Sequence, residues 1–210
     1  MAFNSGSVSF RLFYLQQTVD SSLIEAFAQR AAPPIESLNR DPISGWVSGR
    51  HLFDRELTDE KCVMGPYLHA QLLRAEKKVP AALLRAYVQQ EEDIERRARE
   101  TDVLTRTVRA EIKQRVTESL LPKMPPTLTS IPVVVDFRND LLLAAALSDK
   151  QIDTLSPAFK ETAGALPILL TPETAALRRK RVNANDLEPV SFSPDATLEP
   201  PHETTLGMDF

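Results

Sequence analysis

Residues 131–147 read IPVVVDFRNDLLLAAAL, two apolar runs with a short polar break between them. Each run has the length and the apolar character of a buried β-strand. The Asn and Asp of the break at 138–140 are residues that tight turns prefer. This stretch therefore predicts a β-hairpin in an antiparallel sheet.

The segment before this hairpin predicts helix. Pro80 suits the first turn of a helix, residues 81–121 contain no Gly or Pro, and Pro122 stops the pattern. Apolar residues recur mostly in four-residue steps, which is typical of a helix with one buried stripe. We expect one long charged helix over about 80–121, or two helices with a break near Thr101-Asp102.

The N-terminal part predicts a strand and then a helix. Residues 7–15 alternate apolar with polar side chains, the period of a half-buried strand. A helical apolar spacing follows, and residues 45–47 and 61–74 are expected to be extended, the second as one long or bulged strand. We interpret Trp46 as an anchor of packing.

After the hairpin, the sequence predicts a helix to Ala163 that Gly164 closes, a strand over 166–170 and a short helix from Pro172. The expected fold is α+β, with two strand-helix units that contain antiparallel hairpins and are joined by the long charged helix. Residues 1–182 would form this body. Residues 183–210 are Pro-rich and acidic and are expected to be a tail or linker.

The charge is unevenly distributed. The net charge of the 210 residues is −4, but residues 183–210 carry six acids and no Lys or Arg, which leaves +2 on the first 182 residues. Residues 70–125 hold 12 basic and 9 acidic side chains. This balance permits binding to nucleic acid without proving it.

Several classes of function are disfavoured. No apolar run approaches the length of a membrane span, and the N-terminus lacks the pattern of a secretory signal, so we expect a cytoplasmic protein. The single cysteine, Cys62, and the three scattered histidines predict no metal site, and there is no glycine-rich phosphate loop. We expect no cofactor and no small-molecule substrate.

Carboxylates offer one enzymatic alternative. Asp136 and Asp140 flank the predicted hairpin turn, where a nuclease could place Mg²⁺ ligands. Because Asp is also a common turn residue, we favour the structural interpretation and expect no enzyme.

The basic side chains are more informative. On a continuous helix Arg99, Arg106, Arg109 and Lys113 would lie within about 80° of one another, largely clear of the buried stripe. Such a row can follow a phosphate backbone, but an ordinary solvated helix is favoured on these residues alone. A second cluster, equally compatible with phosphate contact and with charge at a helix C-terminus, is formed by Arg178, Arg179, Lys180 and Arg181.

Several phrases, in a shared order, resemble the RdgC family of recombination-associated proteins. They are LRAEKKVP at 73–80, ESLLPK at 118–123, Val135-Asp136 with the turn at Asn139, and GALPI at 164–168; FRL at 10–12 and GWV at 45–47 also fit. The resemblance covers most of residues 8–172. Family members continue past the last matched strand into a region with a basic finger, so we expect a shorter or truncated relative.

The resemblance implies a ring-shaped homodimer that encloses double-stranded DNA without sequence preference, is associated with the nucleoid and restrains the recombinase RecA. The basic residues on matching segments would contact DNA. They are Lys77, Lys78, Arg99, Arg106, Arg109, Lys113 and Lys123. The alternative is a protein-interaction or assembly module that binds a partner through the long helix or the acidic tail.

Overall fold

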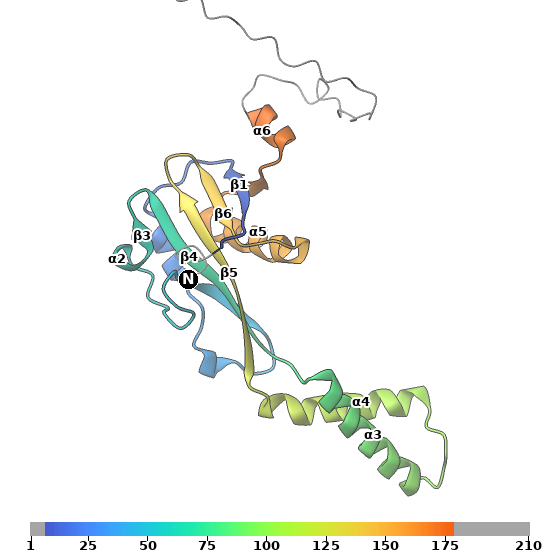
Figure 1. Ribbon diagram of the computed structural model, residues 1–210. Helices are drawn as coiled ribbons and strands as arrows, with labels where there is room; N and C mark the ends of the chain where they lie inside the picture. Colours follow the sequence, from blue (N-terminus) through green and yellow to red (C-terminus); the bar gives the residue numbers. More distant parts are fainter. Residues whose placement is uncertain (1–6, 179–210) are drawn as a thin grey trace, which may run out of the picture. The chain divides into compact units, whose positions relative to one another are not determined.

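The computed structural model describes residues 7–178 (Figure 1). They belong to two compact units, the first ending at Leu170 and the second beginning at Thr171. The first unit combines an antiparallel sheet with helices, which confirms the α+β class. The predicted boundary at residue 182, the acidic tail 183–210 and the basic residues at 179–181 lie outside the described residues and stay predictions.

One antiparallel sheet organises the first unit. Its strands are β1 (Arg11–Leu15), β2 (Ile43–Ser48), β3 (Val63–Met64), β4 (Tyr67–Lys77), β5 (Pro126–Asp136), β6 (Leu141–Ala144) and β7 (Pro167–Leu169). The order across the sheet is β2-β4-β5-β6-β1-β7, and β3 pairs with β4. β1 from the N-terminal part lies between β6 and β7 from the C-terminal part, so the two expected strand-helix units share one sheet. Such long-range pairing leaves no local mark in the sequence.

β5 and β6 form the hairpin that the sequence predicted. β5 and β6 pair from Val133–Ala144 to Asp136–Leu141, and Asp140 adopts φ 51° in the turn. The expected strand over 61–74 is wrong in its first part, because a short helix, α2 (Asp59–Cys62), precedes β3. Gly65, with φ 61°, then turns the chain into β4. A left-handed residue between two strands is a position that glycine fills at little cost.

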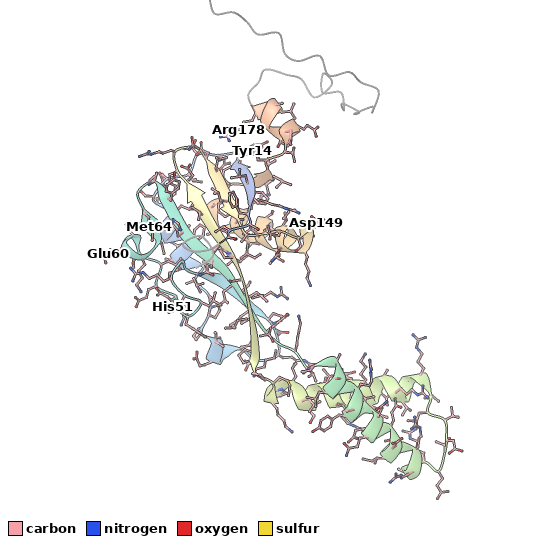
Figure 2. All side chains as sticks on the ribbon, in the orientation of Figure 1. Tyr14, His51, Glu60, Met64, Asp149 and Arg178 are labelled. Carbon is pink, nitrogen blue, oxygen red and sulfur yellow. The ribbon has the colours of Figure 1, made fainter. Side chains whose placement is uncertain are left out.

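Two helices, α1 (Leu23–Gln29) and α5 (Asp149–Ala163), supply the core side chains that pack on one face of the sheet. Phe27, Trp46 and Phe159 form an aromatic cluster with ring centroids 4.3, 6.0 and 6.3 Å apart. Trp46 is 1% exposed, which confirms its role in packing. Gly164 ends α5 with φ 69°, as predicted. The first turn of α5, at Asp149, is labelled in Figure 2.

Two helices occupy the segment 81–120, which confirms the expected alternative with a break near Thr101-Asp102. α3 (Ala81–Ala98) and α4 (Arg106–Leu120) are separated by residues 99–105, where Glu100 adopts φ 50° and Thr105 caps α4 by accepting a hydrogen bond from Val108 N–H. We call α3 and α4 the helical hairpin. A single straight helix could not bury its stripe against itself, whereas the folded pair can. The core of this hairpin consists of Leu104, Ile112, Val116 and Leu120, with Val79, Leu84, Val88 and Val108 packed around it.

The helical hairpin is an insertion between two paired strands. β4 leads through Pro80 into α3, and a 3-10 turn, η2 (Leu121–Lys123), leads from α4 to β5. β4 and β5 pair over eleven residues, ending with Lys77 opposite Pro126. A further 3-10 turn, η1 (Ile35–Ser37), precedes β2.

The second unit is described from Thr171 to Arg178. It contains α6 (Pro172–Arg178), whose first turn is held by a hydrogen bond of 3.1 Å from Thr174 N–H to Thr171 Oγ1. Across residues 7–178, the helices all lack the combination of length and apolar character needed to cross a membrane.

Candidate nucleic-acid interface

Arg106, Arg109 and Lys113 lie on one exposed flank of α4. At 100° per residue these positions fall within about 60° of one another, beside the stripe that packs on α3. Residues three and four positions away from each of them along α4 include no acid. No ion pair among residues 7–178 involves any of the three side chains. We call them the basic face of α4.

Arg99 does not belong to this face, which corrects the expected row of four. It is the C-cap of α3, and the break at 99–105 separates it from α4. Its Nε donates a 2.6 Å hydrogen bond to Glu95 Oε1, one turn back along α3. The pair is an i, i+4 contact of a solvated helix, the interpretation that the sequence favoured.

Two other cations of the helical hairpin, Arg96 and Arg115, also have acid partners. Arg96 contacts Glu92 at 3.0 Å and Asp93 at 2.6 Å. Arg115 of α4 reaches across to Glu91 of α3 at 3.2 Å. A paired cation attracts a phosphate less strongly, because its acid partner cancels part of the positive charge and repels the phosphate. Arg96, Arg99 and Arg115 therefore differ from the basic face in having acid partners. Arg85 and Arg97 of α3 are exposed and, like the basic face, form no ion pair among residues 7–178.

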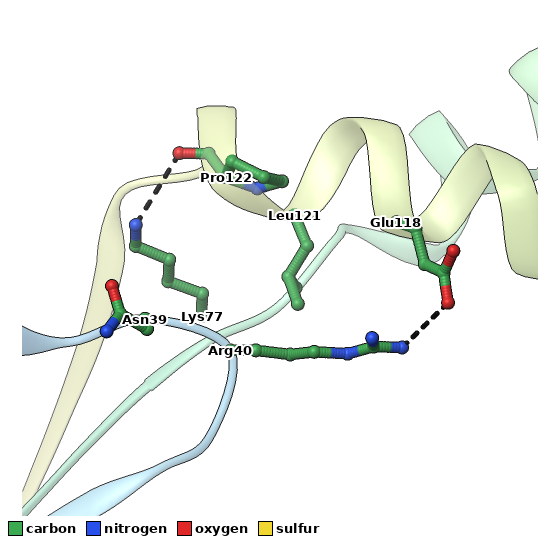
Figure 3. Close-up of a pocket in the computed structure, with 6 residues that line it drawn as sticks. All are labelled: Asn39, Arg40, Lys77, Glu118, Leu121 and Pro122. Carbon is green, nitrogen blue, oxygen red and sulfur yellow. Dashed lines mark hydrogen bonds and ion pairs between the residues drawn. The ribbon is translucent and has the colours of Figure 1, made fainter.

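Lys77 lies where β4 approaches the end of α4 (Figure 3). Its Nζ donates to the carbonyl oxygen of Pro122 at 3.5 Å, in a pocket of about 270 Å³. Arg40 and Glu118 form an ion pair of 2.9 Å in the same pocket. Hydrogen bonds from Gln114 and then from Arg40 hold the pKa of Glu118 below its usual value. Lys77 is thus half-buried at a structural joint.

The remaining predicted residues are dispersed. Lys78 forms an ion pair with Glu76. Lys123, in η2, is exposed and lines a groove between α3 and α4 together with Tyr87 and Met124. Arg178 ends α6 in the second unit, and Arg179, Lys180 and Arg181 lie outside the described residues.

The two aspartates of the nuclease alternative have local roles in the turn. Asp136 is 6% exposed and accepts hydrogen bonds from Arg138 N–H at 2.9 Å and Asn139 Nδ2 at 2.7 Å. Burial by itself raises the pKa of Asp136, but these hydrogen bonds outweigh it and hold the pKa below its ordinary value. Asp140 accepts from Val19 N–H at 3.4 Å. Among the described residues, no three His, Cys, Asp or Glu side chains are grouped to hold a metal ion.

Two basic residues that the sequence did not single out lie together in another hollow. Arg74 and Lys150, with Lys78, line a pocket of about 300 Å³ between β4 and the first turn of α5. Arg74 and Lys150 are 76 positions apart, and neither stands in a run of basic residues. No sequence signal could have paired them.

The comparisons with known proteins bear on the whole of this arrangement. A search of curated proteins found no match to the chain. A family model described as "Putative exonuclease, RdgC" matches residues 9–180. The matched range includes every strand of the sheet, the helical hairpin and α6. It extends across most of the chain, and the resemblance noted in the sequence is confirmed: the chain belongs to the RdgC family.

Proposed function

We propose that this protein binds double-stranded DNA without sequence preference and acts in DNA recombination or replication, with no catalytic step of its own. The observation that carries the proposal is the basic face of α4, where Arg106, Arg109 and Lys113 are exposed and free of acid partners among residues 7–178. Membership of the RdgC family supports the same process.

The spacing of the basic face suits a phosphate backbone. From Arg106 to Lys113 the helix rises about 10 Å, roughly three nucleotide steps of about 3.4 Å along one strand. Long, flexible cationic side chains can reach successive phosphates over that distance. Contacts of this kind position a protein on DNA and carry no base information, so they predict binding without sequence preference.

Further parts of the proposal follow from the family resemblance. The protein would act as a homodimer on the nucleoid in the cytoplasm and restrain a RecA-type recombinase. Lys77, Lys78 and Lys123 would add to the contact with DNA, as would the basic residues at 178–181. Arg99 contributes less, because it is engaged with Glu95.

A second candidate is docking of a protein partner on the helical hairpin. Tyr87 and Ile94 of α3 are 44% and 51% exposed, and because they are seven positions apart they lie on the same side of the helix. Replacing both with Ser would weaken the binding of a protein partner and leave the affinity for DNA unchanged. Changes on the basic face would weaken the binding of DNA and leave that of the partner unchanged.

The test is a salt series of binding to a fluorescent mixed-sequence duplex. We compare the unaltered protein with Arg106→Ala/Arg109→Ala/Lys113→Ala. The matched control, Arg96→Ala/Arg99→Ala/Arg115→Ala, removes the same formal charge from the same hairpin but from paired side chains. Circular dichroism verifies that both variants keep their helix content.

The slope of log affinity against log salt is negative for phosphate contacts. We expect the basic-face variant to reduce its magnitude by about three, and the control to reduce it by much less. Absence of binding by the unaltered protein at low salt would overturn the proposal. Equal slopes in the two variants would overturn the assignment to the basic face. Incubation of the duplex with Mg²⁺ or Mn²⁺ tests the enzymatic alternative, and we expect no shortened strands.

A further inference from the structure

A hollow between the sheet and α5 gathers three basic side chains from two distant parts of the chain. Its volume is about 300 Å³, and Arg74, Lys78 and Lys150 line it. Arg74 and Lys78 come from the end of β4 and the residues just after it, and Lys150 comes from the first turn of α5. We call this the basic hollow.

The register of the sheet explains why Arg74 points into the hollow. Arg74 lies two residues beyond Leu72, a core residue, so both side chains project from the face on which α5 packs. Ser44 of β2 and Thr129 of β5 are directly opposite Arg74 on the two neighbouring strands. Directly paired residues share a face, so a hydroxyl stands on each side of the guanidinium.

The floor and the roof of the hollow come from different elements. Leu72 and Ile131, 4% and 7% exposed, line its apolar base. Lys150 and Thr154, one turn apart on α5, lie over it. The N-terminus of α5 is already closed by a capping box between Ser148 and Gln151, so the hollow depends on side chains rather than on free backbone N–H groups.

The charges in the hollow do not cancel. Glu76 is the one acid among its lining residues, and it contacts both Lys78 and Arg74, the latter at 3.4 Å. The hydrogen bond from Lys78 is the main reason that the pKa of Glu76 lies below its usual value. Lys150 has no ion pair among residues 7–178. Three cations against one anion leave a surplus of two positive charges.

We propose that the basic hollow binds a phosphate group through Arg74, Lys78 and Lys150, with the hydroxyl of Ser44 as a further donor. The hydroxyls of Thr129 and Thr154 already donate to the carbonyl oxygens of Arg74 and Lys150, at 3.4 and 2.9 Å. A planar guanidinium can hold two phosphate oxygens at once, and ammonium groups supply point charges around it. The apolar floor gives the carbon skeleton attached to the phosphate a surface to lie on. The phosphate comes either from the DNA backbone or from a free phosphate compound, and only the first source rests on the proposed function.

Two variants with opposite expected effects test the hollow. Arg74→Ala/Lys150→Ala removes cations from it, and Glu76→Gln removes its acid while keeping the shape of the side chain. Affinity for inorganic phosphate and for pyrophosphate is measured by calorimetric titration. Compared with the unaltered protein, we expect the first variant to bind about tenfold more weakly and the second to bind more tightly. The matched control is Arg138→Ala/Lys160→Ala, which removes two exposed cations outside the hollow.

The same variants are then measured with duplex DNA across a salt series. A slope lowered by about two in Arg74→Ala/Lys150→Ala, and unchanged in the control, assigns the hollow to the DNA backbone. Lost phosphate affinity with an unchanged DNA slope assigns it to a free phosphate compound. If neither measurement separates the hollow variants from the control, the inference is wrong. If phosphate binds in the hollow and DNA binds nowhere, the proposed function fails while the hollow stands.

Discussion

The indole N–H of Trp46 on β2 donates a 2.8 Å hydrogen bond to the hydroxyl of Thr162 on α5. Trp46 is 1% exposed and Thr162 is 9% exposed, so water has little access to either group. The same hydroxyl donates to the carbonyl oxygen of Ala158 at 2.8 Å, which fixes its orientation. This contact ties an outer strand of the sheet to the helix that covers the aromatic cluster.

Thr162→Val is expected to lower the free energy of unfolding by about 1–3 kcal/mol, because it keeps the volume and leaves the buried indole N–H without an acceptor. Urea denaturation followed by tryptophan fluorescence measures the change. Thr162→Ser, which retains the hydroxyl, is the control, and its free energy of unfolding should fall by less. Equal losses in the two variants would assign the effect to packing.

Gly45→Ala is expected to destabilise the fold by roughly 3 kcal/mol or more, the upper range of overpacking. A Cβ at Gly45 would lie 2.5 Å from the Cα of Ala32, a backbone atom that cannot move alone. Gly65→Ala is the comparison, since a Cβ there meets nothing within 4 Å and only the left-handed φ of 61° opposes it, at about 1 kcal/mol. Thermal unfolding of both variants compares their stabilities. A Gly45→Ala variant more stable than Gly65→Ala would contradict the prediction.

Ile112→Ala is expected to loosen the helical hairpin more than the sheet. Ile112 is 2% exposed in a small cluster that does not include the main core residues, and its truncation costs about 2–5 kcal/mol where packing is tight. Hydrogen exchange should show lost protection in α3 and α4, with β4 and β5 retained. Val103→Ala is the control, because Val103 is 74% exposed. A uniform loss of protection across the chain would show that the hairpin and the sheet unfold together.

Asp136 links the stability of the hairpin turn to pH. Its pKa in the folded protein lies below the ordinary value of 3.8, because the hydrogen bonds from Asn139 and Arg138 outweigh burial. The unfolded chain therefore takes up a proton first as pH falls, so the stabilisation is full above about pH 4 and is lost below it. Melting curves between pH 7 and about pH 2.5 should show a smaller loss for Asp136→Asn than for the unaltered protein. Parallel pH dependences of the two proteins would contradict this role.

Much of the local structure was predictable from neighbouring residues. The apolar runs around residues 138–140 predicted the β5–β6 hairpin, Gly164 predicted the end of α5, and the period of residues 7–15 predicted β1, which begins only at Arg11. These features arise within a few residues of one another. Their signals therefore survive in the sequence without knowledge of the fold.

The break between α3 and α4 confirms one of the two expected alternatives, but the sequence alone did not decide between one helix and two. Neither Gly nor Pro stands between residues 81 and 121, yet the chain turns at 99–105 with Glu100 in a left-handed conformation. The turn lets α3 and α4 bury their apolar stripes against each other, a gain that exists only when both are formed. The expected basic row lost Arg99 for the same reason.

Sequence patterns predicted most of the strands and helices, the α+β class and the family, but not α2. Only the tertiary structure shows that β1 pairs with β6 and β7 and that Arg74 and Lys150, 76 positions apart, line one hollow. It also shows that the basic face of α4 has no ion pair among residues 7–178, whereas Arg96, Arg99 and Arg115 have acid partners. The physical reason is that secondary structure depends on contacts within a few residues, whereas strand order and the surroundings of a charge depend on which distant surfaces pack together.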